Sequence, residues 1–395
     1  MAELELNQLT KTYGKITALS ELDLSIGDGE FFVILGPSGA GKTTTLKSIA
    51  GLVDVDHGSV HIGGIDMTQV EPYHRNVAMA FESYALYPQK TVAENLASPL
   101  KSGRTGKYSA EQQRQRIDQV TTTLGIQHLQ ARFPRELSNG QRQRTALGRV
   151  LVRPADIYLL DEPLSHLDAK LRAEMRVELK QLGSMTSTTT VYVTHDYQEA
   201  LALADRIAVI NHGKLLQVGT PAEVWRQPAD TFVARSLGQP EINILDAELS
   251  EGKLVVPDST ISVPVSADLG LSDRDRARVG IRPVDVDIVA PGAAAEAGHV
   301  DVPGKVLLAE RLGRQVELTI DAGGTWLIAL TGGGELAREG AQVLARVPAS
   351  EIHVFAAGEK GEESARLGSA VGDGGPSGPV AGHAANRTDE RGADR

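Results

Sequence analysis

One short segment constrains the fold of this chain more than any other: a glycine-rich loop between an apolar run and a helix-like stretch. The apolar run is Phe31–Leu35, and the loop reads Gly36-Pro37-Ser38-Gly39-Ala40-Gly41-Lys42-Thr43-Thr44. Glycines let the backbone turn so tightly that successive N–H groups point at one phosphate, while the lysine reaches the β/γ oxygens and the first threonine hydroxyl suits Mg²⁺. The start of a helix adds its positive dipole end. The segment therefore predicts a P-loop that binds a nucleoside triphosphate through these nine residues.

Length and composition bound the remaining possibilities. With 395 residues, 41% of them hydrophobic, the chain is expected to form two globular domains. No stretch approaches the roughly 18 consecutive apolar residues of a membrane span, and the start lacks the features of a signal peptide, which predicts a cytoplasmic protein. The absence of cysteine excludes disulfides and thiol catalysis. The net charge of −11 argues against a general nucleic-acid binder.

The first part of the chain has the pattern of an α/β domain. Short β-rich runs alternate with helix-like segments, at Phe31–Leu35, Val77–Phe81, Ile157–Leu160, Thr190–Thr194 and Ile207–Ile210. This alternation predicts a largely parallel sheet covered by helices. Between about residues 84 and 154 helical spacing takes over, with Ile117, Val120 and Leu124 on one face, so we expect a helical subdomain there.

The sequence pattern of the rest of the chain changes twice. Short alternating runs separated by Gly, Pro and Asp predict an all-β domain, with strands at Leu254–Val256, Ile261–Val263, Val284–Ile288 and Val316–Ile320. From about Gly358 onward large apolar residues are almost absent, which predicts a disordered tail. We therefore expect domains at 3–235 and 236–357, followed by a tail at 358–395.

An acid pair narrows the function of the P-loop. The apolar run Ile157–Leu160 ends in Asp161 and Glu162. This is a Walker B arrangement, in which the first acid holds the Mg²⁺ shell and the second polarises an attacking water. Acidic residues at the end of a strand are often only solvated and have no further role. A pair that follows a P-loop at domain-scale distance is instead typical of a site for a metal ion and the attacking water.

The segment Leu137-Ser138-Asn139-Gly140-Gln141 decides the family, because it resembles the signature of ABC-type ATPases. Ser138 suits a helix N-cap, Gly140 allows close backbone approach, and the helix dipole favours a phosphate. The resemblance implies that two such chains close head to tail. Each ATP then lies between the P-loop of one chain and Ser138, Gly140 and Gln141 of the other.

Three further residues match elements of that family in the family's order. Tyr13 resembles the aromatic that stacks on adenine, although alone it would be interpreted as a core or surface aromatic. Ser165–Asp168 resembles the loop that links the two composite sites, and Asp168 is its candidate contact. His195, after Thr190–Thr194, resembles the switch histidine at the γ-phosphate, whereas a lone histidine there would usually only end the strand.

Within the ABC ATPases, residues 3 to 355 resemble the ATPase subunits of carbohydrate importers of the maltose and glycerol-phosphate type. The matching phrases are Tyr84–Pro88, Asp161–Ser165, Leu167–Arg172, Gly219–Glu223 and Gly280–Pro283. The resemblance implies an ATP-hydrolysing, Mg²⁺-dependent subunit at the cytoplasmic face of the membrane. It pairs with a second ATPase and two permease subunits, and acts indirectly with an extracytoplasmic solute-binding protein.

The same resemblance assigns roles to residues. Glu162 becomes the general base, His195 the γ-phosphate sensor, and Lys42 and Thr43 the phosphate and Mg²⁺ holders, with Asp161 as the acid of the metal shell. The resemblance implies that the β-rich domain is an oligobinding-fold-like regulatory domain; the alternative is a domain with a purely structural role. Tyr84–Pro88 suits a groove for a membrane-subunit helix, or plain packing of the helical subdomain.

The chain departs from its relatives at three positions. Glu82 stands where the family has a glutamine, Asn139 where glycine is usual, and His166 where asparagine is common. Glu82 either adds negative charge near the triphosphate or serves as a stronger Mg²⁺ ligand, so we include it among the metal and nucleotide residues. The three changes leave open an ATP-binding partner of a second, related ATPase with reduced hydrolysis of its own. A soluble ABC protein acting on nucleic acid is disfavoured because the chain lacks a coiled-coil insertion and a second cassette.

Overall fold

The structure is a computed structural model that describes residues 2–81, 86–101, 108–165, 167–186, 188–334, 336, 338–359 and 362–373. The chain divides into two units, Met1–Val224 and Trp225–Arg395. This division lies before the boundary expected at residue 235. One reason is that Arg282 of the second unit donates hydrogen bonds to the carbonyls of Ala234 and Leu237, which ties the end of helix α8 (Thr231–Ser236) to that unit.

The first unit contains two sheets. The six-stranded sheet has the order β10-β9-β3-β8-β7-β6 and is parallel except for the antiparallel pair β10–β9. Its strands are β10 (Lys214–Gly219), β9 (Arg206–Asn211), β3 (Phe31–Leu35), β8 (Thr189–Thr194), β7 (Ile157–Asp161) and β6 (Val77–Ala80). An antiparallel sheet has the order β2-β1-β4-β5. It is made of β2 (Ile16–Ile26), β1 (Leu4–Tyr13), β4 (His57–Ile62) and β5 (Ile65–Asp66).

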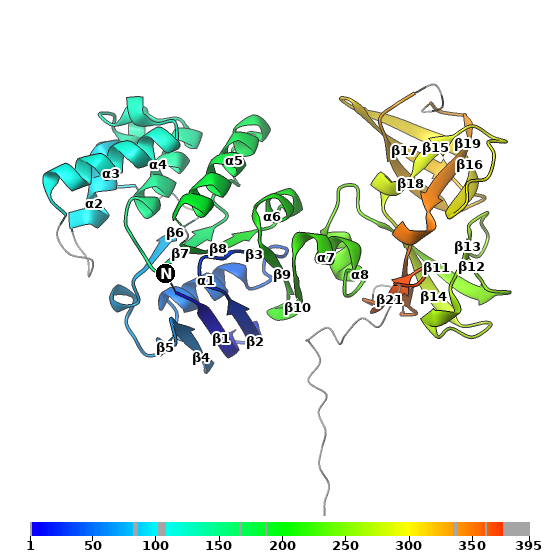
Figure 1. The fold of residues 1–395 in the computed structure, drawn as a ribbon, viewed down its shortest axis with the longest axis horizontal. Helices are drawn as coiled ribbons and strands as arrows, with labels where there is room; N and C mark the ends of the chain where they lie inside the picture. Colours follow the sequence, from blue (N-terminus) through cyan, green and yellow to red (C-terminus); the bar gives the residue numbers. More distant parts are fainter. Residues whose placement is uncertain are drawn as a thin grey trace, which may run out of the picture. The chain divides into compact units, whose positions relative to one another are not determined.

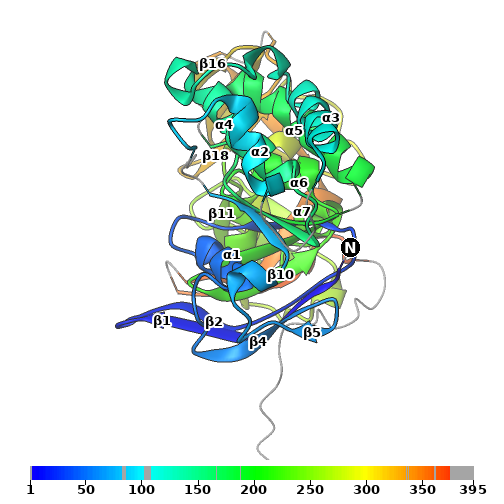
Figure 2. The ribbon, with the colours of Figure 1, turned by 90° about the vertical axis from the view of Figure 1, so that its left-hand side faces the viewer.

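Helices surround these sheets. They are α1 (Lys42–Ala50), α2 (Val92–Lys101), α3 (Ala110–Thr123), α4 (Asn139–Leu151), α5 (Ala169–Thr186) and α6 (Tyr197–Leu203), with α7 (Pro221–Arg226) at the division between the units. Figures 1 and 2 show α1 next to the antiparallel sheet, where Leu46 and Ile49 are buried in a core shared by both sheets. The expected helical stretch holds α2, α3 and α4, and Ile117, Val120 and Leu124 are all buried. Among the described residues, no helix is long and apolar enough to cross a membrane.

The second unit is built mainly of strands, as expected. One sheet has the order β13-β12-β11-β14-β20-β21 and the other β15-β19-β16-β17-β18. The first is made of β13 (Ser262–Pro264), β12 (Lys253–Val255), β11 (Asn243–Ser250), β14 (Arg276–Ile281), β20 (His353–Ala356) and β21 (Arg366–Ser369). The second is made of β15 (Asp287–Val289), β19 (Gln342–Pro348), β16 (His299–Leu312), β17 (Gln315–Asp321) and β18 (Trp326–Thr331). Short 3₁₀ helices lie at Pro72–His74, Gln127–Leu129, Pro134–Glu136, Ala267–Leu269, Pro283–Asp285 and Ala349–Glu351.

Two expectations for this unit are wrong. The strand expected at Val284–Ile288 is only β15 (Asp287–Val289), because Pro283, with its fixed φ and missing N–H, opens a 3₁₀ turn instead. The disorder expected from Gly358 does not hold for residues 366–369, which form β21 and pair with β20. Backbone pairing with β20 is one of the contacts that hold this segment in place. Residues 374–395 lie outside the described part of the chain.

Candidate nucleotide site

The predicted site residues of the first unit meet at one edge of the parallel sheet. The loop Gly36–Thr44 follows β3, Asp161 and Glu162 follow or end β7, and His195 follows β8. These three strands are neighbours in the order β3-β8-β7. Parallel strands carry their carboxyl ends to the same edge, where ligands of open α/β sheets bind. The topology therefore gathers residues from three distant parts of the sequence into one site.

The P-loop follows a backbone path that needs glycine at two places. A Cβ on Gly36 would lie 2.4 Å from the carbonyl oxygen of Ile210, and one on Gly41 would lie 2.5 Å from the carbonyl oxygen of Ala18. Gly41 also has a φ of 108°, which side chains rarely adopt. Gly39 has a φ of 81°, and a Cβ there would meet no heavy atom within 4 Å, so its requirement for glycine is conformational rather than steric. The tight backbone path of the loop is consistent with the predicted phosphate cradle.

Lys42 and Thr43 lie at the start of α1 and contact neighbouring groups of the site. Lys42 is 5% exposed and its Nζ donates hydrogen bonds to the carbonyl oxygens of Gly36 and Pro37, at 2.8 and 3.0 Å. Thr43 Oγ1 donates to Asp161 Oδ1 over 3.1 Å. A hydroxyl beside a carboxylate is the donor set that Mg²⁺ takes in P-loop proteins, so the residues present fit that ion.

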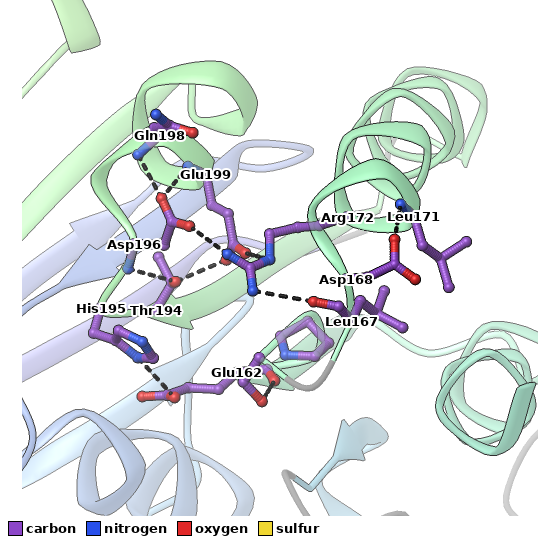
Figure 3. Close-up of polar contacts among 12 residues, drawn as sticks. Glu162, Leu167, Asp168, Leu171, Arg172, Thr194, His195, Asp196, Gln198 and Glu199 are labelled. Atoms are coloured by element: carbon purple, nitrogen blue, oxygen red, sulfur yellow. Dashed lines mark hydrogen bonds and ion pairs between the residues drawn. The ribbon is translucent and has the colours of Figure 1, made fainter. Parts of the chain in front are cut away.

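Glu162 lies between a lysine and a histidine. Its carboxylate is 3.3 Å from Lys42 Nζ through one oxygen and 2.9 Å from His195 Nδ1 through the other. Figure 3 shows the contact with His195. The residue has a φ of 43°, a left-handed conformation that is uncommon outside glycine, and its N–H donates to the carbonyl oxygen of Val193. The backbone thus turns away from β7 at Glu162, and the side chain meets both partners.

The predicted signature segment forms a capped helix start. Ser138 is the N-cap of α4, its hydroxyl accepts the N–H of Gln141, and the Gln141 side chain accepts the N–H of Ser138. A Cβ on Gly140 would lie 2.8 Å from the side chain of Leu171, so this glycine also lets α4 approach α5 closely. Asn139 accepts a hydrogen bond from Arg142. Contact of this helix start with the nucleotide of another chain stays a prediction.

Tyr13 and Asp168 hold simpler positions. Tyr13 ends β1 with its side chain 47% exposed, which excludes the alternative of a core aromatic, and the Lys11 ammonium lies 5.5 Å from the centre of its ring. Asp168 precedes α5 and accepts the N–H of Leu171. The roles of both residues toward nucleotide stay predictions. Glu82 and His166 lie outside the described residues, as do Ser83, Tyr84 and Ala85.

Sequence reasoning missed a polar network beside His195. Arg172, Asp196 and Glu199 converge from α5, the start of α6 and α6 itself (Figure 3). Glu199 is 3% exposed and accepts hydrogen bonds from the Tyr192 and Thr194 hydroxyls. Burial raises the pKa of Glu199, and the hydrogen bonds from Thr194 and Tyr192, followed by the charge of Arg172, oppose that shift. In the sequence Arg172 was only the last residue of a family phrase, so no local pattern marked it.

Comparisons with known proteins agree with this geometry. The ABC transporter family model matches residues 19–165. The xylose/arabinose import ATP-binding protein XacJ of Haloferax volcanii is 42% identical, with 90% of this chain and 94% of the relative covered. The chain belongs to the ATP-binding proteins of ABC transporters. The trehalose/maltose import ATP-binding protein MalK of Thermococcus litoralis is also 42% identical, covering 90% of this chain and 98% of the relative. The sn-glycerol-3-phosphate import ATP-binding protein UgpC of Chromohalobacter salexigens is 41% identical, covering 90% and 94%.

A solved structure supports the fold of this ABC ATPase. The dimeric ATP-binding cassette MJ0796, in a post-hydrolysis state with ADP and Pi, aligns with a TM-score of 0.51 and 31% identity. The alignment covers 98% of that cassette and 55% of this chain. The expected fold class is confirmed: an ABC ATPase domain followed by an all-β domain. As a member of this family the chain binds and hydrolyses ATP and is associated with a membrane transporter.

Proposed function

We propose that this ABC ATPase energises import of a carbohydrate, polyol or glycerol-phosphate-like solute from the cytoplasmic face of the membrane. The relatives that match both of its units are named for import of pentoses, disaccharides or glycerol phosphate. A second ATPase subunit and two permease subunits complete the transporter, with an extracytoplasmic solute-binding protein as an indirect partner. The all-β unit serves as its regulatory domain.

The residues at the edge of the sheet divide the work of phosphoryl transfer to water. Glu162 is the general base, which takes a proton from the attacking water at its carboxylate. His195, hydrogen-bonded to the other oxygen of that carboxylate, orients it and senses the γ-phosphate. Lys42 holds phosphate oxygens, and Tyr13 stacks on the adenine. Ser138, Gly140, Gln141 and Asp168 contact the ATP held by the second subunit.

Thr43 and Asp161, whose hydroxyl and carboxylate oxygens lie 3.1 Å apart, would hold Mg²⁺. Glu82 is added to them through the family resemblance alone. When bound, the ion neutralises charge on the phosphates. Lys42 Nζ lies 3.3 Å from the Glu162 oxygen that does not contact His195, and so helps to direct that carboxylate toward the site.

The observation that carries this proposal is the position of the Glu162 carboxylate between Lys42 and His195. We expect Glu162→Gln to lower ATP turnover about 100-fold or more, because an amide cannot accept the proton, while MgATP binding is kept. Glu30 is the matched control. It is a partly buried acid of the same unit, paired with Arg206 away from the site, and Glu30→Gln should change turnover less than twofold. Unchanged turnover in the Glu162 variant would refute the assignment.

The partner ATPase is tested with the same variant. Light scattering of the Glu162→Gln chain, with and without MgATP at increasing protein concentration, should show ATP-dependent dimers if two copies of this chain build both sites. Monomers that bind ATP at every concentration would assign the second subunit to a different, related ATPase. Reversion of Glu82 to glutamine would then be the next variant to measure.

A further inference from the structure

Arg172 connects three segments around His195 (Figure 3). Its Nη2 donates to the carbonyl oxygen of Leu167, 3.1 Å away in the loop before α5. Its Nη1 donates to Asp196 Oδ2 at 3.2 Å, and its Nε is 3.8 Å from Glu199 Oε1. The planar guanidinium suits such a task, because its donors point in fixed and different directions. One side chain therefore joins the loop of Asp168 to the loop of His195.

The two residues on either side of His195 are both fixed in this network. Thr194 Oγ1 donates to the buried carboxylate of Glu199 over 2.7 Å and accepts the N–H of Asp196 over 3.0 Å. Asp196 caps α6 by accepting the N–H groups of Gln198 and Glu199. The imidazole of His195 is itself 55% exposed, and its hydrogen bond with Glu162 spans 2.9 Å. The direction of the imidazole therefore depends strongly on the backbone that Thr194 and Asp196 hold.

We propose that Arg172 is a positioning residue, which fixes the loop of His195 relative to the loop of Asp168 and thereby keeps the imidazole on Glu162. A small cleft between the two loops is lined by Glu162, Ser165, Arg172, Thr194, His195, Asp196 and Glu199, so Arg172 lies in the wall next to the proposed base. The inference rests on the proposed roles of Glu162 and His195. It adds a residue that touches neither the P-loop lysine nor the metal ligands among its described contacts.

If Arg172 served only to neutralise nearby charge, a lysine in its place would keep its function. Arg172 also supplies a positive charge between the carboxylates of Asp196 and Glu199, which would repel each other without it. A lysine supplies the same charge through a single nitrogen, so it cannot reproduce the fixed fork to the Leu167 carbonyl and the Asp196 carboxylate. Arg172→Lys therefore separates neutralisation of charge from positioning of the loops.

The experiment measures ATP turnover, MgATP affinity and melting temperature of the full chain carrying Arg172→Lys. We expect the melting temperature and affinity to stay close to wild type, while turnover falls about tenfold. Arg153→Lys is the matched control. Arg153 also forks between a carbonyl and a side chain, those of Val77 and Asn76, but at the amino ends of the strands. Its turnover should stay within twofold of wild type.

A double-mutant cycle gives a second, independent measure. Asp196→Asn keeps the cap of α6 but removes the charge that faces Arg172, and we expect it to lower turnover severalfold. The double variant Arg172→Lys/Asp196→Asn should then lose less than the product of the two single losses, because both changes break one connection. Multiplicative losses would overturn the proposal, as would turnover of Arg172→Lys within twofold of wild type or equal to that of Arg153→Lys. If Glu162→Gln itself left turnover unchanged, the proposed function would fail separately.

Discussion

Arg278 fastens the C-terminal segment, which the sequence predicted to be disordered, onto the second unit. It lies in β14 and is 5% exposed. Its guanidinium donates to the carbonyl oxygens of Gly358, Glu359 and Glu362, and to Ser364 Oγ, over 2.6 to 3.0 Å. We expect Arg278→Met, which keeps the length of the side chain and removes every donor, to release this segment from β20.

The size of the effect follows from which acceptors lose their partner. A hydrogen bond to a charged group contributes about 1.5 to 3 kcal/mol, so the four bonds to this segment would suggest an upper limit of about 12 kcal/mol. A fifth bond, from Nε to the carboxylate of Asp246, is also lost, but that carboxylate is mostly exposed and regains water. The carbonyls of Gly358, Glu359 and Glu362 belong to exposed residues and regain water once released, whereas Ser364 is buried. We therefore expect a loss of about 3 kcal/mol in the free energy of unfolding of this unit.

The two tryptophans make the assay selective. Trp225 and Trp326 are the only tryptophans of the chain, and both belong to the second unit, so their fluorescence reports unfolding of that unit. With an m-value of about 1.5 to 2 kcal/mol/M, a loss of about 3 kcal/mol lowers the urea midpoint by about 1.5 to 2 M. Hydrogen exchange gives a local measure, because the amides of Ala356 and Ala370 are bonded across this region.

Arg276→Met is the control, because Arg276 lies two residues earlier on the same strand with an exposed side chain. Its urea midpoint should change little. A midpoint for Arg278→Met equal to that of Arg276→Met, with unchanged exchange at Ala356 and Ala370, would refute the reasoning. The segment would then be held by its backbone pairing alone.

Two further predictions concern the nucleotide base and the pH dependence of the second unit. Tyr13→Ala should weaken MgATP binding about tenfold, because the stacking contact with adenine is lost. Tyr73→Ala, at another exposed tyrosine, is the control and should leave the dissociation constant for MgATP unchanged. Equal effects of the two substitutions would exclude a special role for Tyr13. Burial raises the pKa of Asp285 to about 6, so folding favours the protonated form of this carboxyl. Its contribution to the free energy of unfolding of the second unit is therefore lost as the pH rises from about 4 to about 6. Asp285→Asn cannot ionise, so the variant should avoid about 1 to 2 kcal/mol of this pH-dependent loss of stability, a value that allows for the partial exposure of the side chain. Burial also lowers the pKa of His353 to about 3, so this histidine adds stability as the pH rises and acts in the opposite sense to Asp285. The measurement is therefore the difference in the free energy of unfolding by urea between the variant and wild type at each pH, not the pH dependence of wild type alone. A difference that does not change with pH would contradict the prediction.

Strands buried on both faces were predictable to within a residue or two. Phe31–Leu35 is β3 as expected, and Ile157–Leu160 extends by one residue to Asp161 in β7. A continuous apolar run is the pattern of a parallel strand covered by helices, so local sequence is enough. Val284–Ile288 failed because its alternation was read without the effect of Pro283 on the backbone.

The C-terminal segment shows the limit of composition. Residues 366–369 carry little apolar area, which is why they were expected to be disordered. Their order comes from pairing with β20 and from the Arg278 contacts with the neighbouring residues 358–364. Partners that lie far away in sequence leave no local pattern, so this order was not predictable from composition.

The sequence by itself determined that this protein binds a nucleoside triphosphate and resembles the ABC ATPases, because a phosphate cradle is built from a few consecutive residues whose chemistry is local. It also singled out Asp161 and Glu162 as an acid pair at the end of an apolar run, and His195 through its resemblance to the switch histidine of the family. Only the tertiary structure decided that Glu162 joins Lys42 to His195, and that Arg172 joins the loops of Asp168 and His195. Those contacts depend on the order of β3, β8 and β7 in the sheet, and strand order is set by long-range packing rather than by any local run of residues.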